Sequence, residues 1–402
     1  MQFLIHGATS LLPSSTGFKE WDKVNIGLSD AFIDFVRPPS VHGAINEGAV
    51  FDGTGLIALP GIVDLHGDAF ERQIQPRPET VFSYDIALAD TDRQLVANGI
   101  TTACHGVTFS WEGGLRGRES ALALLRQVMQ KRKHFHADHR IHLRFENHHV
   151  DGLNDALDWI AQGWISFVAF NDHLPSIMRK SKQPEKLSAY AERARCDAPT
   201  FVERMQSAHA RSAEVDGIVK RLAAACRQRG IPMASHDDET RADRERYHAI
   251  EATISEFPRS SDALAAAREF GSRIIMGAPN VLLGGSHCGS LSATETVRTG
   301  MCDILTSDYY YPSLLHAPFR LAYQENACSL ADAWKLVSQH PAETLGLRDR
   351  GRIAQGYRAD LLLVEAQPGG DVRLVATIAA GRLAYCAEPQ RLTTHRLYPL
   401  AA

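Results

Sequence analysis

Between residues 59 and 344, short apolar segments alternate with longer segments that have the composition of helices. Parallel strands need connections of this length between them, most often a helix. Strands are expected at 62–66, 100–107, 140–146, 165–172, 231–236, 252–257, 273–277 and 303–307. Among the expected helices are those at 120–134, 198–229, 260–270 and 292–300. Eight strands that alternate with helices predict an α/β fold, most simply a (β/α)8 TIM-like barrel.

The two ends of the chain have a different rhythm, with short apolar segments that Gly, Pro and Ser separate, as in a small sheet. Strands are expected there at 3–5, 24–28, 31–36, 56–58, within 351–364, and at 372–375 and 377–384. We therefore predict a small β-sandwich domain built from residues 1–58 and 345–402, and a barrel domain over residues 59–344. The strongly charged stretch 178–197 is predicted to be a mobile, solvated loop above a strand end.

The composition restricts the class of protein. The chain has 402 residues, 44% hydrophobic and 22% charged, which fits a soluble globular protein. A net charge of −4 offers no basic field, so neither nucleic acid nor an anionic membrane is an expected partner. No apolar run approaches the ~20 residues of a membrane span, and no signal peptide is indicated. The seven scattered cysteines favour reduced thiols and a cytoplasmic protein.

Potential metal ligands stand where the apolar strands end. The first strand closes as His66-Gly67-Asp68, and because alternate residues of a strand share a face, His66 and Asp68 should point the same way. In a parallel barrel all strands end on one face, so ligands from several strands should meet there. The predicted metal ligands are His66, Asp68, Glu146, His173, His236 and Asp308.

A single histidine at a strand end is more often a hydrogen-bonded structural residue than a ligand. Five such segments in one barrel favour metal binding, because buried charge is costly unless it is paired or metal-bound. Three neighbouring histidines, His105, His148 and His149, are alternatives to the nominated ligands, although each is otherwise an ordinary loop histidine.

Six nitrogen and oxygen ligands suit one or two divalent ions. Zn²⁺ is the expected ion, with Mn²⁺ and Fe²⁺ as alternatives, and Glu146 is the carboxylate expected to reach both ions of a pair. A bound divalent ion lowers the pKa of its water towards ~7 and polarises the substrate. Asp308, at the end of the last strand, is the expected catalytic residue, which touches the metal and accepts the proton of the attacking water. The expected reaction is hydrolysis.

Two segments that frame the barrel resemble the amidohydrolase superfamily. They are Leu-Pro-Gly-Ile-Val-Asp-Leu-His at 59–66 and Gly-Arg-Ile-Ala-Gln-Gly-Tyr-Arg-Ala-Asp-Leu at 351–361. The resemblance implies a metal-bearing barrel flanked by a sheet domain made from both chain ends. Most members have His-x-His where this chain has His66-Gly67-Asp68, and an aspartate there still binds a hard cation but changes the charge of the site.

Blocks between residues 59 and 312 resemble, in combination, the PhnM group of the carbon–phosphorus lyase pathway. These blocks lie at 66–72, 75–78, 234–240, 276–280, 284–287 and 306–310. The resemblance implies phosphoanhydride cleavage, because members hydrolyse alpha-D-ribose 1-methylphosphonate 5-triphosphate to the 5-phosphate and pyrophosphate. The chain departs from the group after His173, where Leu174-Pro175-Ser176 replaces a Thr-Pro-Gly-Gln-Arg-like run.

A triphosphate substrate needs cations and hydrogen-bond donors. Arg77 follows the first metal motif, and Arg144 shares the strand face of Glu146, although a structural pair with a buried acid is the alternative for Arg144. Ser286 and His287 lie in a Gly-rich loop after the seventh strand, where barrel phosphate sites often form. These four are the predicted substrate-binding residues.

Three functions remain open at this point. The first is a PhnM-type diphosphatase that acts on a small phosphorylated molecule. The second keeps the metal site but acts on a carboxamide, a cyclic amide or an N-acyl amino acid. The third is a catalytically silent protein on the same fold, which the six competent ligands disfavour. Relatives are often dimers or tetramers, so a homo-oligomer is compatible with the resemblance.

Overall fold

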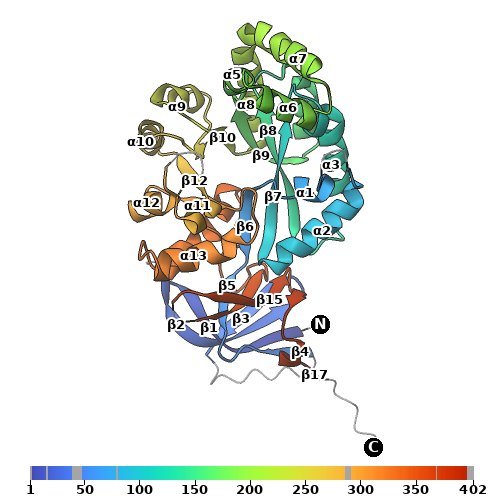
Figure 1. Cartoon of the computed structure of the whole chain (residues 1–402). Helices are drawn as coiled ribbons and strands as arrows, with labels where there is room; N and C mark the ends of the chain where they lie inside the picture. The colour runs from blue at the N-terminus through green and yellow to red at the C-terminus, as the bar shows by residue number, and fades with distance from the viewer. Residues whose placement is uncertain are drawn as a thin grey trace, which may run out of the picture.

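The computed structural model describes residues 2–14, 17–38, 48–77, 80–285, 291–367 and 369–395. Eight parallel strands form one sheet in sequence order from β6 to β13 (Figure 1). They are β6 (Ile62–Gly67), β7 (Ile100–Phe109), β8 (Asp138–Glu146), β9 (Ile165–Asn171), β10 (Met233–His236), β11 (Ile254–Glu256), β12 (Arg273–Gly277) and β13 (Ile304–Thr306). All eight predicted strands are confirmed, and the α/β barrel with them.

The barrel closes between its first and last strands through residues that follow β13. A parallel bridge joins Gly67 to Asp308, and the Asp308 amide donates to the His66 carbonyl at 2.9 Å. The buried Asp64 carboxylate accepts hydrogen bonds from the Ser307 amide at 3.1 Å and the Ser307 hydroxyl at 2.6 Å. The sheet is therefore nearly closed, and the seam lies directly beside the predicted ligands.

Helices cover the outside of the barrel and one of its ends (Figure 1). They are α1 (Glu71–Ile74), α2 (Tyr84–Ala97), α3 (Arg118–Lys131), α4 (Leu153–Ala161), α5 (Leu174–Lys180), α6 (Pro184–Arg193), α7 (Ala198–Ala210), α8 (Val215–Arg229), α9 (Arg241–His248), α10 (Ser261–Glu269), α11 (Ala278–Leu283), α12 (Ala293–Arg298), α13 (Ser313–Tyr323), α14 (Leu330–Lys335) and α15 (Gln339–Thr344). The single helix predicted at 198–229 is two helices, because the 3₁₀ turn Ser212–Glu214 interrupts it. Among the described residues, no helix has both the length and the apolarity that crossing a membrane requires.

The loop predicted at 178–197 is wrong, because most of this stretch is helical. Prolines stand in the first turns of both α5 and α6, where a missing amide hydrogen costs nothing. The helices pack a narrow apolar face, which includes Ile177 and Ala191, against Phe201 of α7. The other faces of α5 and α6 carry many charged residues, so the apolar face is difficult to recognise in the sequence. In Figure 1, α5, α6 and α7 lie at the end of the barrel away from the terminal strands.

The chain ends form a separate nine-stranded sheet, which confirms the predicted β domain made from both ends (Figure 1). Its strands are β1 (Gln2–Ser14), β2 (Gly17–Ser29), β3 (Phe32–Arg37), β4 (Gly48–Asp52), β5 (Ile57–Pro60), β14 (Leu361–Ala366), β15 (Val372–Ala379), β16 (Arg382–Cys386) and β17 (Leu392–His395). β5 pairs antiparallel with β14, and β4 with β17. The domain boundaries at 58/59 and 344/345 stay predictions, and β5 itself runs across the first of them.

Candidate metal centre and active site

The strand ends bring the predicted ligands into two groups. His66, Asp68 and Asp308 form one, and His173, His236 and Asp237 form the other; within each group the donor atoms lie within 4.8 Å of one another. The sixth predicted ligand, Glu146, lies against the second group, with an oxygen 2.5 Å from His173 Nδ1. Asp237 was not among the ligands predicted from the sequence.

Glu256, at the end of β11, is the largest omission of the sequence interpretation. Its two carboxylate oxygens accept from His66 Nδ1 at 2.9 Å and from His236 Nδ1 at 2.6 Å. The two imidazole rings are nearly parallel, at 14°. Burial alone would raise the pKa of Glu256, but His66, His142 and the two hydrogen bonds outweigh it, so that pKa lies well below its usual value. Glu256 therefore holds both histidines with Nδ1 protonated and the Nε2 lone pair available.

The donor set fits a divalent cation. Carboxylates outnumber guanidinium groups at the strand ends, since Arg144 is accompanied by Asp68, Glu146, Asp237, Glu256 and Asp308. His142, deeper in the barrel, is fully buried with neither ring nitrogen hydrogen-bonded, and it forms a third possible ligand group with His66 and Glu256. An excess of carboxylates, some of them buried, and unpartnered imidazole nitrogens are what a bound zinc-like ion would satisfy.

Asp308 has the properties of a proton acceptor. Burial, together with Asp68 and Glu256, raises its pKa to about 6, against the opposing effect of His66 and Arg144. Its backbone has a left-handed φ of 54°, which is uncommon outside glycine. Hydrogen bonds to the backbone of His66 and Asp68 fix it there. The carboxylate is therefore held in place within the first ligand group.

His173 forms an ion pair with Glu146 in the metal-free protein. Burial lowers the pKa of His173, but Glu146 and Asp237 outweigh it and raise that pKa to about 9. The pKa of Glu146 falls to about 2 despite its burial, because His173 lies so close. A cation that takes either side chain as a ligand must displace this proton.

The three alternative histidines lie elsewhere. His105 is buried and contacts His139 Nδ1 at 2.9 Å, on a network that ends at Asp92. His148 lies 3.4 Å from Asp172, and His149 packs on Phe109, where burial lowers its pKa to about 4. None of the three joins a ligand group among the described residues.

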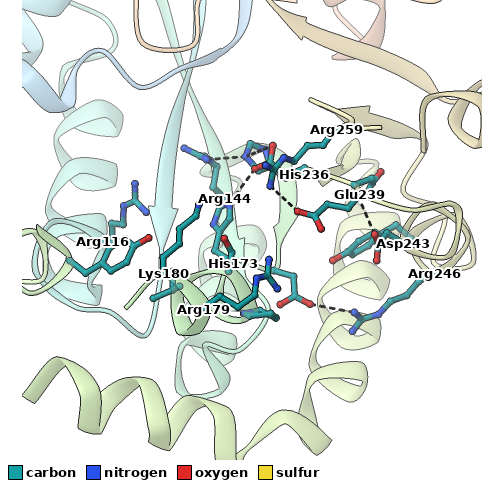
Figure 2. Close-up of a pocket in the computed structure, with 18 of the residues that line it drawn as sticks. Arg116, Arg144, His173, Arg179, Lys180, His236, Glu239, Asp243, Arg246 and Arg259 are labelled. Carbon is teal, nitrogen blue, oxygen red and sulfur yellow. Dashed lines mark hydrogen bonds and ion pairs between the residues drawn. The ribbon is translucent and has the colours of Figure 1, made fainter. Parts of the chain in front are cut away.

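A cavity of about 460 Å³ opens beside the second ligand group (Figure 2). His173, His236 and Asp237 lie in its wall, together with carboxylates of the segment after β10. Its cations come from the loop after β7, from β8, from α5 and α6, and from α9 and the loop after β11. They are Arg116, Arg144, Arg179, Lys180, Arg193, Arg246 and Arg259. The cavity is therefore rich in both signs of charge, with cations in the majority.

The predicted substrate-binding residues have different outcomes. Arg144 lines the cavity. Arg77 is exposed and does not line it. Ser286 and His287 lie outside the described residues. Arg179 and Lys180, assigned from the sequence to a solvated loop, face the cavity from α5, because the segment that carries them is helical.

Gly67, between the two ligands of the first strand, has no room for a side chain. A Cβ there would lie 2.8 Å from Asp64 Oδ2 and 2.9 Å from Ser307 Oγ, the pair that closes the barrel. We predict that Gly67→Ala lowers the free energy of unfolding by about 1–3 kcal/mol, as overpacking of a rigid site does. Urea unfolding of the metal-free protein would measure it.

Gly217→Ala is the matched control, because a Cβ at that position in α8 would meet nothing within 4 Å. Replacing a helical glycine by alanine should raise the free energy of unfolding by up to about 1 kcal/mol. Equal unfolding midpoints for the two variants would contradict the steric account of Gly67.

Comparison with known proteins identifies the family and the fold of this chain. The profile of the amidohydrolase family matches residues 57–384. The chain is 37% identical over 321 residues to the alpha-D-ribose 1-methylphosphonate 5-triphosphate diphosphatase of Escherichia coli, which is 78% of this chain and 84% of that protein.

Solved structures show the same fold at low identity. A dihydropyrimidinase from Brevibacillus agri has a TM-score of 0.58 at 13% identity, covering 95% of each chain. A beta-aspartyl dipeptidase from Fervidobacterium islandicum has a TM-score of 0.60 at 17% identity, covering 99% of this chain and all of that one. Because the family profile matches most of this chain, the chain belongs to the amidohydrolase family.

Proposed function

We propose that the protein is a metal-dependent hydrolase that cleaves alpha-D-ribose 1-methylphosphonate 5-triphosphate to the 5-phosphate and pyrophosphate, as a step in phosphonate catabolism. The observation that carries the proposal is the cation-rich cavity directly beside a cluster of metal-type ligands. The 37% identity to a diphosphatase of that name supports the choice of substrate. A carboxamide or a cyclic amide offers these cations no anionic group, and an N-acyl amino acid offers a single carboxylate, whereas a triphosphate offers several negative charges.

The cations divide into held and free groups. Arg116 and Arg193 both contact the buried carboxylate of Glu112, the first at 3.5 Å, so their guanidinium groups are fixed in position. Arg179 and Lys180, in contrast, have no ion-pair partner among the described residues. Fixed donors and unpaired cations in one cavity suit a polyphosphate, which brings several negative charges.

In the proposed reaction, water attacks the phosphorus next to the ribose and the bond to the pyrophosphate oxygen breaks. A divalent ion, most simply Zn²⁺, with Mn²⁺ or Fe²⁺ as alternatives and as one or two ions, would activate that water and polarise the phosphoryl oxygens. We propose His66, Asp68, Glu146, His173, His236 and Asp308 as the residues that hold it, with Glu256 orienting two of them. Asp308 accepts the proton that the water loses.

The test is product release by the purified full-length protein. With the ribose triphosphate as substrate, pyrophosphate should appear in equal amount to the 5-phosphate, and a chelator should abolish its release. Release of inorganic phosphate alone, or hydrolysis of an N-acyl amino acid or a cyclic amide in preference to the triphosphate, would reject the proposal and favour the amide chemistry of other family members.

The unpaired cations of α5 give a prediction for binding. Replacing Arg179 and Lys180 together by alanine should raise KM about fivefold or more and change kcat little, because they grip phosphates that do not react. Steady-state kinetics on the ribose triphosphate would measure both constants. Lys182→Ala is the matched control, since Lys182 is exposed in the same segment but does not line the cavity.

An unchanged KM in the α5 double variant would show that these cations stay in solvent. Arg77 remains a proposed substrate contact outside the described cavity. A rise in KM for Arg77→Ala as large as that of the α5 variant would place it at the substrate.

A further inference from the structure

Arg144 is a buried cation with few partners. Its side chain points inward from β8 and is only 9% exposed. One terminal nitrogen lies 3.3 Å from Asp68 Oδ2, and the other donates to His236 Nε2 at 3.1 Å, the contact drawn in Figure 2. Its buried Nε has no hydrogen-bond partner among the described residues. A guanidinium that keeps its charge when buried normally has all its donors satisfied, so this one is weakly held.

The two partners of Arg144 belong to different ligand groups. Asp68 is in the group with His66 and Asp308, and His236 is in the group with His173. Because His236 Nδ1 donates to Glu256, its Nε2 carries the lone pair that accepts from Arg144. A metal ion would need that same lone pair, and it would also need the carboxylate of Asp68. The guanidinium and a divalent ion therefore compete for the side chains of Asp68 and His236.

We propose that Arg144 is an internal counter-cation, which occupies Asp68 and His236 in the metal-free protein and yields them to the divalent ion. The inference rests on the metal site of the proposed function and adds an exchange of one cation for another. The arginine cannot relieve the repulsion by losing a proton, so it must move. Arg144 also lines the cavity, and a substrate phosphate there is the anion that would receive it.

This exchange couples metal binding to anion binding. An ion that displaces the guanidinium makes it available to phosphate, and a phosphate that attracts the guanidinium frees the ligands. The coupling must be equal in both directions, because binding free energies are linked. An arginine that only supported the ligands would have the opposite effect, since its loss would leave Asp68 and His236 less well placed.

The test measures the affinity of the metal alone for the full-length, metal-free protein by calorimetry with Zn²⁺ or Mn²⁺. Arg144→Ala should bind the ion about tenfold more tightly than the wild type, or more, because a charge-assisted hydrogen bond no longer opposes it. Unchanged or weaker binding by a folded variant would overturn the proposal. The measurement does not depend on turnover, so failure to cleave the triphosphate would leave this result standing.

Chemical replacement of the side chain provides a second measurement. Free guanidinium at millimolar concentration should weaken metal binding by Arg144→Ala relative to sodium chloride of the same ionic strength, and no difference would overturn the proposal. Arg144→Lys serves if the alanine variant does not fold: a single ammonium cannot contact both ligands, so its metal affinity should exceed that of the wild type.

Arg246→Gln is the matched control for the loss of a cavity cation. Arg246 lines the same cavity but pairs with Asp172 at 3.6 Å and with Asp216 at 2.9 Å, away from the ligand groups. Its replacement should leave the metal affinity within twofold or so of the wild type. An increase equal to that of Arg144→Ala would mean that general charge repulsion, not exchange at Asp68 and His236, sets the affinity.

Discussion

Asp308→Asn should lower kcat for pyrophosphate release by about 10²- to 10⁴-fold, which is the usual contribution of a positioned general base. The amide cannot accept the proton of the attacking water. The fold should survive, because asparagine tolerates the left-handed φ of 54° that this position requires. Rates measured on the metal-loaded protein, with circular dichroism to confirm folding, would test it.

The role of Asp308 as the base also predicts how the activity of the wild type depends on pH. Burial raises the pKa of Asp308 to about 6 in the metal-free protein, and the base is active only when deprotonated. A bound cation favours the charged carboxylate, so kcat/KM should fall as the pH drops through about 6 or a lower value, and the residual activity of Asp308→Asn should lack this limb.

Asp303→Asn is the control for Asp308. It also exchanges a carboxylate next to β13, but at the opposite end of the strand, where Asp303 pairs with Arg268 at 3.0 Å. Its rate per folded molecule should stay close to that of the wild type. A near-normal rate for Asp308→Asn would remove that residue from the proposed chemistry.

Glu256→Gln should lower the metal affinity about 10- to 100-fold, as loss of the partner that orients a ligand does. The Glu256 carboxylate accepts a hydrogen bond from His66 Nδ1 and another from His236 Nδ1. A glutamine accepts from only one of them, and its NH₂ group faces the other. That second imidazole must then carry its proton on Nε2, where it blocks the metal. Calorimetry with Zn²⁺ and elemental analysis of the purified variant would measure the loss.

Glu269→Gln is the control, since Glu269 is exposed and, in the described part of the chain, forms an ion pair only with Arg241. It should bind metal as the wild type does. If Glu256→Gln kept its full metal content, the Glu256 carboxylate would stabilise the barrel but would not orient His66 and His236 for metal binding.

The barrel could be predicted from sequence because its signal is repeated. Each strand is an apolar run bounded by polar residues, and eight such runs at helix-length spacing leave few alternative folds. The ligand groups followed from the same rule, since His66, Asp68, His173, His236 and Asp308 all stand at strand ends. Arg144 was correctly placed on the same strand face as Glu146. The two residues are two positions apart in β8, and alternate residues of a strand share a face.

What the sequence did not yield depends on partners distant in the chain. Glu256 follows a three-residue strand, and its importance comes from two imidazoles on β6 and β10 that approach it only in the closed barrel. The same rule of a strand closed by a potential ligand would have found it. The α5–α6 segment was misjudged because its charges are numerous and its apolar face is narrow, so that tertiary packing on α7 decides its structure.

The terminal sheet has a consequence for how the chain is made. Ala58 of β5 pairs with Leu363 of β14, and the Thr377 hydroxyl reaches the Val96 carbonyl across 281 residues. During translation β5 is therefore made on the order of tens of seconds before β14, the strand with which it pairs. Until then an open strand edge and much of the apolar face beneath it stay uncovered, so nascent chains of this enzyme should depend on chaperones more than their final stability suggests.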